Sequence, residues 1–273
     1  MPHSNILRNI LVIALINLSL VVAIFDFDKF FAGTAPSPQL IHTKSVYTNT
    51  KADQGSNQIL GLTDNFPKYE FCNLIFENRL VSPDSILEVV DKENMLPADY
   101  VPNDLRTLDA SKYNVTRTIQ LRESAYNSLI PMLNDMNSAD LEYAITSGYR
   151  SYTTQQYAFN YWARYVGLAE AGGFAASPGY SEHQLGTTVD IMSAENNFKA
   201  TSYMGQTQVG IWLKDNAYKY GFVQSYPEGK TAITGYNYEP WHYRYVGKYV
   251  AGQIHENSLS LTEYLYDFYN ICL

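Results

Sequence analysis

The sequence predicts an α+β fold in which helices pack on one face of a small antiparallel sheet, with a membrane helix at the N-terminus. Apolar residues recur at helical spacing from Leu121 to Met136, and a second helix is expected over 209–220. Short apolar runs at 141–146, 222–223 and 238–246 are expected to be strands. With 273 residues and 46% apolar content, the chain can bury one substantial core.

The first 32 residues are predicted to be a membrane anchor or a signal segment. Ile10 to Phe25 contains no charged residue and approaches the length of about 20 residues that spans a bilayer. Arg8 precedes this run and Asp26 follows it, so the positive-inside bias places the N-terminus in the cytoplasm and the remainder outside. We expect an uncleaved, single-pass anchor. Cleavage of a signal peptide, which would give a secreted protein, is the alternative.

Residues 33–68 have the composition of a polar tether, because they are rich in Ser, Thr, Asn, Gln and Pro and lack periodic apolar positions. The folded domain is expected over 69–273, with an extended, proline-punctuated lead-in from Leu87 to Leu105. The net charge of −8 argues against a nucleic-acid partner, since binding to phosphates requires an excess of Lys and Arg. In an exported chain the only two cysteines, Cys72 and Cys272, are expected to form a disulfide, with two buried thiols as the alternative.

Local signals place the remaining elements of the domain. Pro131 is expected to kink the first helix. The strand at 141–146 leads into a turn, after which Thr153 can cap a helix that extends to about Glu170. A loop rich in Gly, Ala and Pro follows at 171–179, and Gly221 is expected to end the helix at 209–220.

Two histidines and an aspartate stand in a pattern typical of a catalytic zinc site. His183 and Asp190 form S-x-H-x(6)-D, and His242 ends an E-x-x-H motif about fifty residues later. Three protein ligands leave the fourth tetrahedral position open for water. We therefore expect zinc to be bound by His183, Asp190 and His242 on the sheet face opposite the helices. Neither the cysteines nor the other histidines offer a comparable set: His3, His42 and His255.

The spacing of these residues demands two local distortions. His183 and Asp190 are seven residues apart, an offset that puts them on opposite faces of an ideal strand, so a turn around Gly186 must lie between them. Pro240 excludes a regular central strand between Glu239 and His242. Glu239, a carboxylate that is not needed as a ligand, is the natural general base.

These stretches resemble the signatures of the VanY-type D-alanyl-D-alanine carboxypeptidases, whose superfamily includes lysostaphin-type peptidases and hedgehog domains. The matching patterns are S-E-H-Q-x-G-x-x-V-D from Ser181 and Y-P-E-G-K-x-x-I-T-G-Y-x-Y-E-P-W-H-Y-R-Y-V-G from Tyr226. The resemblance covers roughly residues 87–264. It implies a zinc peptidase that removes the terminal D-alanine from peptidoglycan stem peptides outside the cytoplasmic membrane of a bacterium. Thr187, Thr188 and Ser225 depart from the pattern and put the shape of the pocket in doubt.

The resemblance also implies the substrate-side residues. Arg150, within Ser147-Gly148-Tyr149-Arg150-Ser151-x(3)-Gln155, would polarise the scissile carbonyl and stabilise the oxyanion. Ser181 and Gln155 would bind the terminal carboxylate or the backbone of the substrate. Tyr149 and Trp241 would line the wall of the cleft.

Three alternatives share this site. An L,D-carboxypeptidase or a peptidoglycan endopeptidase would use the same metal with a different pocket. A non-catalytic, hedgehog-like zinc module is disfavoured because both Glu239 and Arg150 are present.

Overall fold

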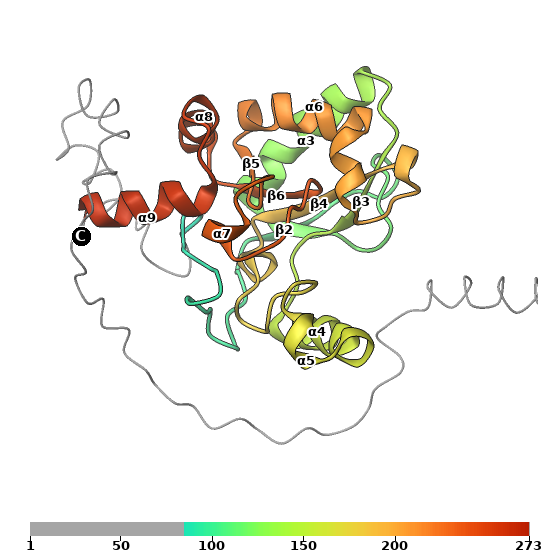
Figure 1. Cartoon of the computed structure of the whole chain (residues 1–273). Helices are drawn as coiled ribbons and strands as arrows, with labels where there is room; N and C mark the ends of the chain where they lie inside the picture. The colour runs from blue at the N-terminus through green and yellow to red at the C-terminus, as the bar shows by residue number, and fades with distance from the viewer. Residues whose placement is uncertain (1–84, 273) are drawn as a thin grey trace, which may run out of the picture. The chain divides into compact units, whose positions relative to one another are not determined.

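The centre of the molecule is an antiparallel sheet whose strands lie in the order β3-β4-β6-β5 (Figure 1). The computed structural model describes residues 85–272, which all belong to one compact unit. The four strands are β3 (Tyr143–Ser147), β4 (Thr188–Ser193), β6 (His242–Tyr245) and β5 (Phe222–Gln224). A separate hairpin pairs β1 (Leu105–Thr107) with β2 (Gln120–Arg122). The predicted α+β class is confirmed.

One face of the sheet packs against helices α3 (Glu123–Ser138) and α6 (Gln208–Asn216), which Figure 1 shows together on one side. Successive side chains of a strand point to opposite faces, so Val189 and Ile191 of β4 enter this core. Tyr243 of β6 joins them there. Asp190 and His242, which alternate with these residues, lie on the opposite face.

The first predicted helix is confirmed, with a shifted start. Its apolar stripe is buried in α3: Ala125, Leu129, Met132, Leu133 and Met136. Leu121 is also buried, but it belongs to β2. Pro131 lies inside the helix, which continues to Ser138.

The predicted helix at 209–220 is α6 followed by a 3-10 turn, η7 (Ala217–Tyr220). Gly221 ends it in the left-handed region, with φ of 88°, as expected of a C-terminal glycine. The turn η7 packs against α3 and α6 packs against β4, so both elements belong to the outer layer of the core.

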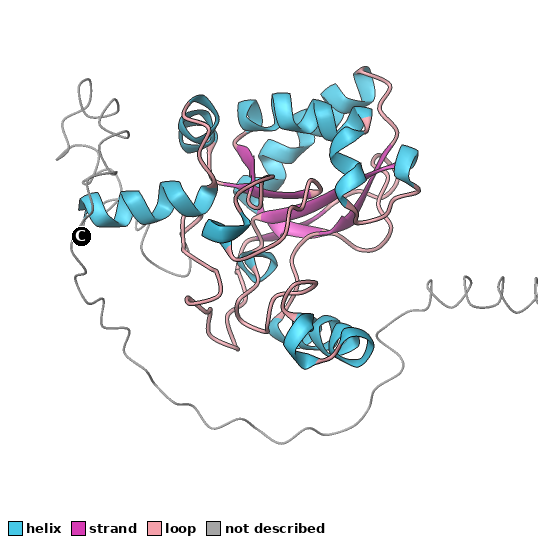
Figure 2. Cartoon of the chain, in the orientation of Figure 1, coloured by secondary structure: helices cyan, strands magenta, loops and turns pink. Residues whose placement is uncertain are grey.

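The prediction for the helix after β3 was wrong at both ends. Ser151, not Thr153, is the N-cap of α4 (Tyr152–Val166), because its Oγ accepts a hydrogen bond of 3.2 Å from the Thr154 N–H. The helix ends at Gly167, and α5 (Leu168–Ala171) follows. Figure 2 shows that these two helices lie across the sheet from α3 and α6, so helices occupy both sides rather than one.

The C-terminal part forms a second core with the lead-in segment. Helix α7 (Thr231–Thr234) lies between β5 and β6 in the chain, and α8 (Lys248–Glu256) and α9 (Leu261–Cys272) follow β6. Leu87 packs with Val246, Ile254 and Leu265. The short 3-10 helices are η4 (Glu182–Leu185), η5 (Ala194–Asn196) and η6 (Ser202–Gln206).

Several predictions fall outside the described residues: the membrane anchor at 1–32, the tether at 33–68, the start of the domain at 69, and the Cys72–Cys272 disulfide. Within 85–272, no helix is long and apolar enough to cross a membrane.

Candidate metal and catalytic site

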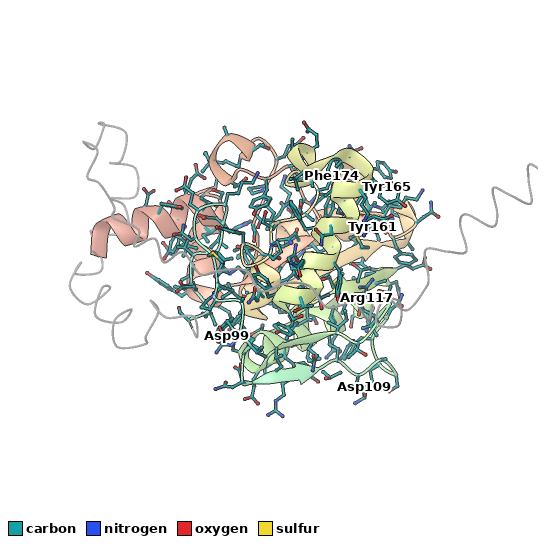
Figure 3. All side chains as sticks on the ribbon, turned by 90° about the horizontal axis from the view of Figure 1, so that it is seen from below. Asp99, Asp109, Arg117, Tyr161, Tyr165 and Phe174 are labelled. Atoms are coloured by element: carbon teal, nitrogen blue, oxygen red, sulfur yellow. The ribbon has the colours of Figure 1, made fainter. Side chains whose placement is uncertain are left out.

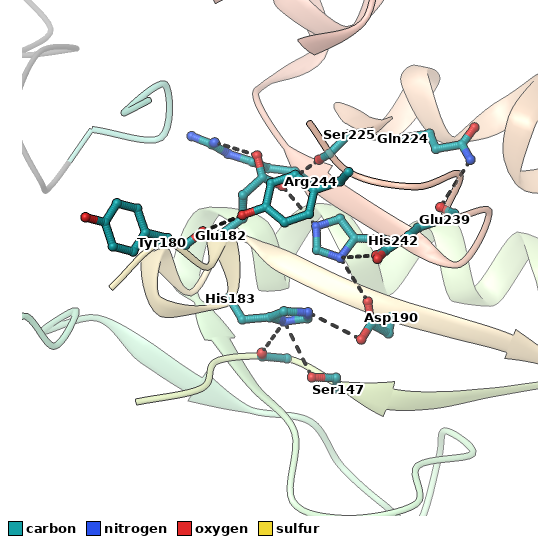
Figure 4. A network of polar contacts seen from close by, with 12 residues as sticks. Ser147, Tyr180, Glu182, His183, Asp190, Gln224, Ser225, Glu239, His242 and Arg244 are labelled. Atoms are coloured by element: carbon teal, nitrogen blue, oxygen red, sulfur yellow. Dashed lines mark hydrogen bonds and ion pairs between the residues drawn. The ribbon is translucent and has the colours of Figure 1, made fainter. Parts of the chain in front are cut away.

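Three side chains from three elements converge beneath the sheet (Figure 4). His183 comes from η4, Asp190 from β4 and His242 from β6, and all three are buried. One ligand atom from each residue lies within 4.8 Å of the other two. The structure therefore brings together the three ligands that the sequence predicted.

Register and one turn produce this convergence. Asp190 and His242 are direct partners in the β4–β6 ladder, so their side chains share a face. His183 reaches the same place because Gly186 turns the chain between η4 and β4. Gly186 has φ of 72°, a conformation that glycine adopts without steric cost, and this is the turn that the spacing required.

Hydrogen bonds fix which nitrogen of each ring faces the centre. His183 Nδ1 lies 2.8 Å from the Gly148 carbonyl oxygen and donates to it, which leaves Nε2 facing Asp190 Oδ2 at 3.3 Å. His242 Nε2 lies 2.9 Å from Glu182 Oε2, which leaves Nδ1 facing Asp190 Oδ1 at 3.2 Å. Such partners orient histidines as metal ligands.

The electrostatics of the cluster favour a cation. Asp190 Oδ1 is buried without a conventional hydrogen-bond partner among the described residues. Burial alone would lower the pKa of His242, but the adjacent carboxylates of Asp190 and Glu182 raise it to about 10. A metal ion at Nδ1 would replace that proton and would also satisfy the buried aspartate oxygen. The residues present thus fit a three-ligand metal site.

Glu182 is the carboxylate that holds His242, a role that no local sequence pattern indicated. Its Oε2 also accepts from Ser225 Oγ at 2.6 Å, and its Oε1 accepts from Arg244 Nη1 at 2.9 Å. Burial by itself would raise the pKa of Glu182, but Arg244 and the hydrogen bonds from His242 and Ser225 lower it to about 2. Glu182 is therefore a fixed anion behind the ligand.

Arg244 ties this carboxylate to the start of the domain. Its side chain is fully buried, and Nη2 donates to the carbonyl oxygens of Ile86 at 3.0 Å and Glu88 at 2.6 Å. Arg244 follows His242 by two residues on β6, so strand alternation was the signal that could have placed it on the same face. Ser225, which the sequence marked only as a departure from the family pattern, contacts the site through Glu182.

Glu239 reaches the cluster through a turn. The His242 N–H donates to the Glu239 carbonyl at 3.2 Å, with Pro240 at the second position, where its fixed φ suits a turn. Glu239 Oε2 lies 3.7 Å from His242 Nδ1. Burial raises the pKa of Glu239 to about 7; His242 opposes this shift and Asp190 adds to it. A carboxyl group with such a pKa can both accept and return a proton near neutrality.

Arg150 is held at the edge of the same site. Its backbone N–H donates to the His183 carbonyl at 3.1 Å, Nη1 donates to Gln155 Oε1 at 2.8 Å, and Nη2 donates to Ser147 Oγ at 3.0 Å. Burial lowers the pKa of Arg150, whereas the charges of Asp190 and Glu239 raise it. The guanidinium therefore remains a cation facing the carboxylates.

The other predicted substrate residues occupy varied positions. Gln155 is buried with both polar groups engaged, since Nε2 donates to the Ala176 carbonyl at 2.7 Å. It supports Arg150, which differs from the expected contact with substrate. Ser181 is buried just before η4, and Tyr149 and Trp241 are half-buried. Contact of these three with a substrate stays a prediction.

An aromatic wall on the His242 side was not predicted. The Tyr226 ring lies 4.8 Å from the His242 ring and 4.6 Å from the Tyr236 ring, measured between centroids. Burial raises the pKa of Tyr226 well above its usual value, so its hydroxyl stays protonated. The Tyr226 ring therefore limits the movement of the His242 imidazole, whose Nε2 is held by Glu182.

A buried three-ligand cluster, a free carboxyl group and an arginine define the site of a metal-dependent hydrolase. The model of the VanY family, described as D-alanyl-D-alanine carboxypeptidase, matches residues 118–248. YodJ of Bacillus subtilis strain 168, predicted to be a carboxypeptidase, is 42% identical over 186 residues, which are 67% of this chain and 68% of YodJ. The chain belongs to the VanY family.

Solved structures similar to this one include an LD-carboxypeptidase and a D,D-pentapeptidase. The LD-carboxypeptidase LdcB is 40% identical with a TM-score of 0.63, and the match covers 68% of this chain and 87% of LdcB. A mutant of the vancomycin-resistance D,D-pentapeptidase VanY, in complex with Zn(II), is 33% identical with a TM-score of 0.55. That match covers 66% of this chain and 98% of the VanY chain.

Removal of either histidine should abolish stoichiometric zinc binding, because two ligands do not complete the set. His183→Ala and His242→Ala are expected to purify with little zinc by elemental analysis. His255→Ala is the matched control, since His255 is exposed on α8. Full zinc content in either ligand variant would contradict the assignment.

Glu182→Gln should weaken zinc binding about 10- to 100-fold, the usual effect of losing the partner of a metal-bound histidine. The amide keeps the size of the side chain but removes the charge that faces His242 and Arg244. Competition with a chelator measures the affinity, and Glu195→Gln, at an exposed position of η5, serves as the control. Unchanged affinity in Glu182→Gln would show that Glu182 does not support the ligand.

Proposed function

We propose that this chain is a zinc-dependent carboxypeptidase that removes the terminal D-alanine from peptidoglycan stem peptides ending in D-Ala-D-Ala. The observation that carries the proposal is the presence of the ligand cluster, Glu239 and Arg150 in one site. Membership of the VanY family supports the same reaction.

His183, Asp190 and His242 would hold the zinc ion, which when bound lowers the pKa of water and polarises a carbonyl group. Glu239 accepts a proton from the water whose oxygen bonds to the scissile carbonyl carbon. It then delivers that proton to the nitrogen of the leaving D-alanine as the peptide bond breaks. These two proton transfers balance, because Glu239 begins and ends the catalytic cycle as a carboxylate.

Arg150 stabilises the oxyanion in this mechanism. Each terminal nitrogen of the Arg150 guanidinium donates one hydrogen bond, Nη1 to Gln155 and Nη2 to Ser147. These bonds fix the plane of the guanidinium before a substrate arrives. Preorganised donors of this kind act where negative charge develops in the transition state. The hydroxyl of Ser181, beside the cluster, is the proposed donor to the terminal carboxylate of the substrate.

A second candidate is cleavage of an L,D bond, which the similarity to the LD-carboxypeptidase LdcB favours. The ligand set, Glu239 and Arg150 would perform the same hydrolysis, and the pocket would select a tetrapeptide stem. A peptidoglycan endopeptidase is a weaker alternative, because it does not require groups that recognise a free carboxylate. A non-catalytic binding module would have no use for Glu239.

Glu239→Gln should abolish turnover and leave zinc bound. The amide cannot accept the proton of water, and loss of a general base reduces kcat about 10²-fold or more. Release of D-alanine and zinc content are measured on the same preparation. Glu228→Gln, near the site in sequence but exposed, is the control. Retained turnover in Glu239→Gln would place the base elsewhere.

Substrate selectivity tests the reaction itself. A soluble pentapeptide stem ending in D-Ala-D-Ala should lose one D-alanine, and amidation of its terminal carboxylate should remove most activity, since the donors that pair with the anion would face a neutral group. Mass spectrometry of penta- and tetrapeptide stems separates the candidates. Cleavage of the tetrapeptide alone selects the L,D reaction, and cleavage at an internal cross-link selects the endopeptidase.

We place the site outside the cytoplasmic membrane of a bacterium, with residues 1–32 as a single-pass anchor. The apolar run and its flanking charges support this location. The full-length chain should be found in the membrane fraction, and protease added to intact spheroplasts should digest its domain outside the membrane. A shortened chain in the medium would instead select signal cleavage, and protection from protease would contradict export.

A further inference from the structure

Helix α4 carries an exposed aromatic stripe that the hydrolytic mechanism does not use. Tyr157, Tyr161 and Tyr165 recur every four residues, so they lie along one side of the helix. Tyr161 is 43% exposed and Tyr165 is 71% exposed. Phe174, just after α5, is 52% exposed and extends the stripe, as Figure 3 shows.

The rings form a preorganised surface. Tyr161 and Tyr165 have centroids 4.7 Å apart, and Tyr161 meets Trp162 edge-on at 5.6 Å. Trp162 stacks on Phe174 at 4.9 Å, which ties α4 to the segment after α5. Contacts between rings restrict their rotation, so a ligand that stacks on them loses less entropy on binding.

This helix is not a core helix. Of the 15 residues of α4, only Gln155 is buried, whereas α3 buries five of 16. Its exposed tyrosines, Tyr157, Tyr161 and Tyr165, therefore contribute little to the stability of the domain by burial. Contiguous exposed aromatic side chains mark interaction surfaces in soluble proteins.

The first turn of α4 lies at the catalytic site, because Gln155, on the inner side of the helix, holds Arg150. The tyrosines follow along the outer side of the same helix, beginning with Tyr157. A ligand that extends from the peptide cleft along α4 would reach Tyr161 and Tyr165 next. In a peptidoglycan substrate, the part attached to the stem peptide is the glycan strand.

The chemistry of the stripe suits sugars. The apolar C–H faces of pyranose rings stack on aromatic rings, and tyrosine hydroxyls can exchange hydrogen bonds with sugar hydroxyls. Arg164 is the only charged residue of α4, so the helix lacks the cluster of Lys and Arg that binds anionic lipids. We propose that Tyr161, Tyr165 and Phe174 form a platform for the glycan strand of peptidoglycan, an inference that rests on the proposed function.

Binding of glycan strands freed from their stem peptides tests the platform without hydrolysis. The full-length, zinc-loaded chain should bind these strands, and Tyr161→Ala/Tyr165→Ala should weaken the Kd about tenfold or more, the scale of loss when stacked aromatic rings are removed from a binding site. Tyr161→Phe/Tyr165→Phe keeps the rings and should retain most of the affinity. Tyr249→Ala, a tyrosine 49% exposed on α8, is the matched control.

Activity separates the platform from the catalytic site. Tyr161→Ala/Tyr165→Ala should keep the native kcat/KM on a soluble pentapeptide, which also reports correct folding, and should lose about tenfold on polymeric peptidoglycan. Native affinity for glycan in this variant would overturn the platform. So would an equal loss in Tyr249→Ala, or binding by the stripe to anionic lipid vesicles but not to glycan. If the native chain binds glycan but releases no D-alanine from the soluble pentapeptide, the proposed function fails while the platform stands.

Discussion

The buried carboxylate of Glu182 is the constraint on which the site depends. It lies between Arg244 and His242, and it holds the imidazole so that Nδ1 faces Asp190. A buried charge that loses its partner costs about 3–5 kcal/mol, so the three residues form a unit that tolerates no single loss. Because Arg244 also binds the carbonyl oxygens of Ile86 and Glu88, the lead-in segment is part of this unit.

The two faces of the central sheet divide the tasks of stability and chemistry. Val189, Ile191 and Tyr243 fill the core beneath α3 and α6, while the residues between them point to the ligand cluster. A shift of one residue in the β4–β6 pairing would exchange these faces. The apolar core therefore specifies the register that places Asp190 opposite His242.

The opposite side of the sheet carries the elements that complete the site. The turn at Gly186 delivers His183, the turn at Pro240 delivers Glu239, and the segment after β3 delivers Arg150. Helix α4 follows Arg150 directly and contributes little to the core. Its freedom from packing leaves its outer side available for contact with a large substrate, whereas Gln155 keeps its inner side fixed to the arginine.

The sequence by itself determined the ligands, the candidate base and the α+β class, because each depends on local spacing. Short motifs contain the three ligands and Glu239: His183, Asp190, Glu239 and His242. The apolar residues of α3 recur with the period of a helix, which the sequence alone reveals. The boundary of α4 was predicted wrongly because Ser151 and Thr153 are both good caps, and only the fold decides which one is used. The network that joins Glu182 to Ser225 and Arg244 came from the tertiary structure alone. The three residues are separated by up to 62 residues in the chain, and their hydrogen bonds depend on strand pairing that no local pattern records.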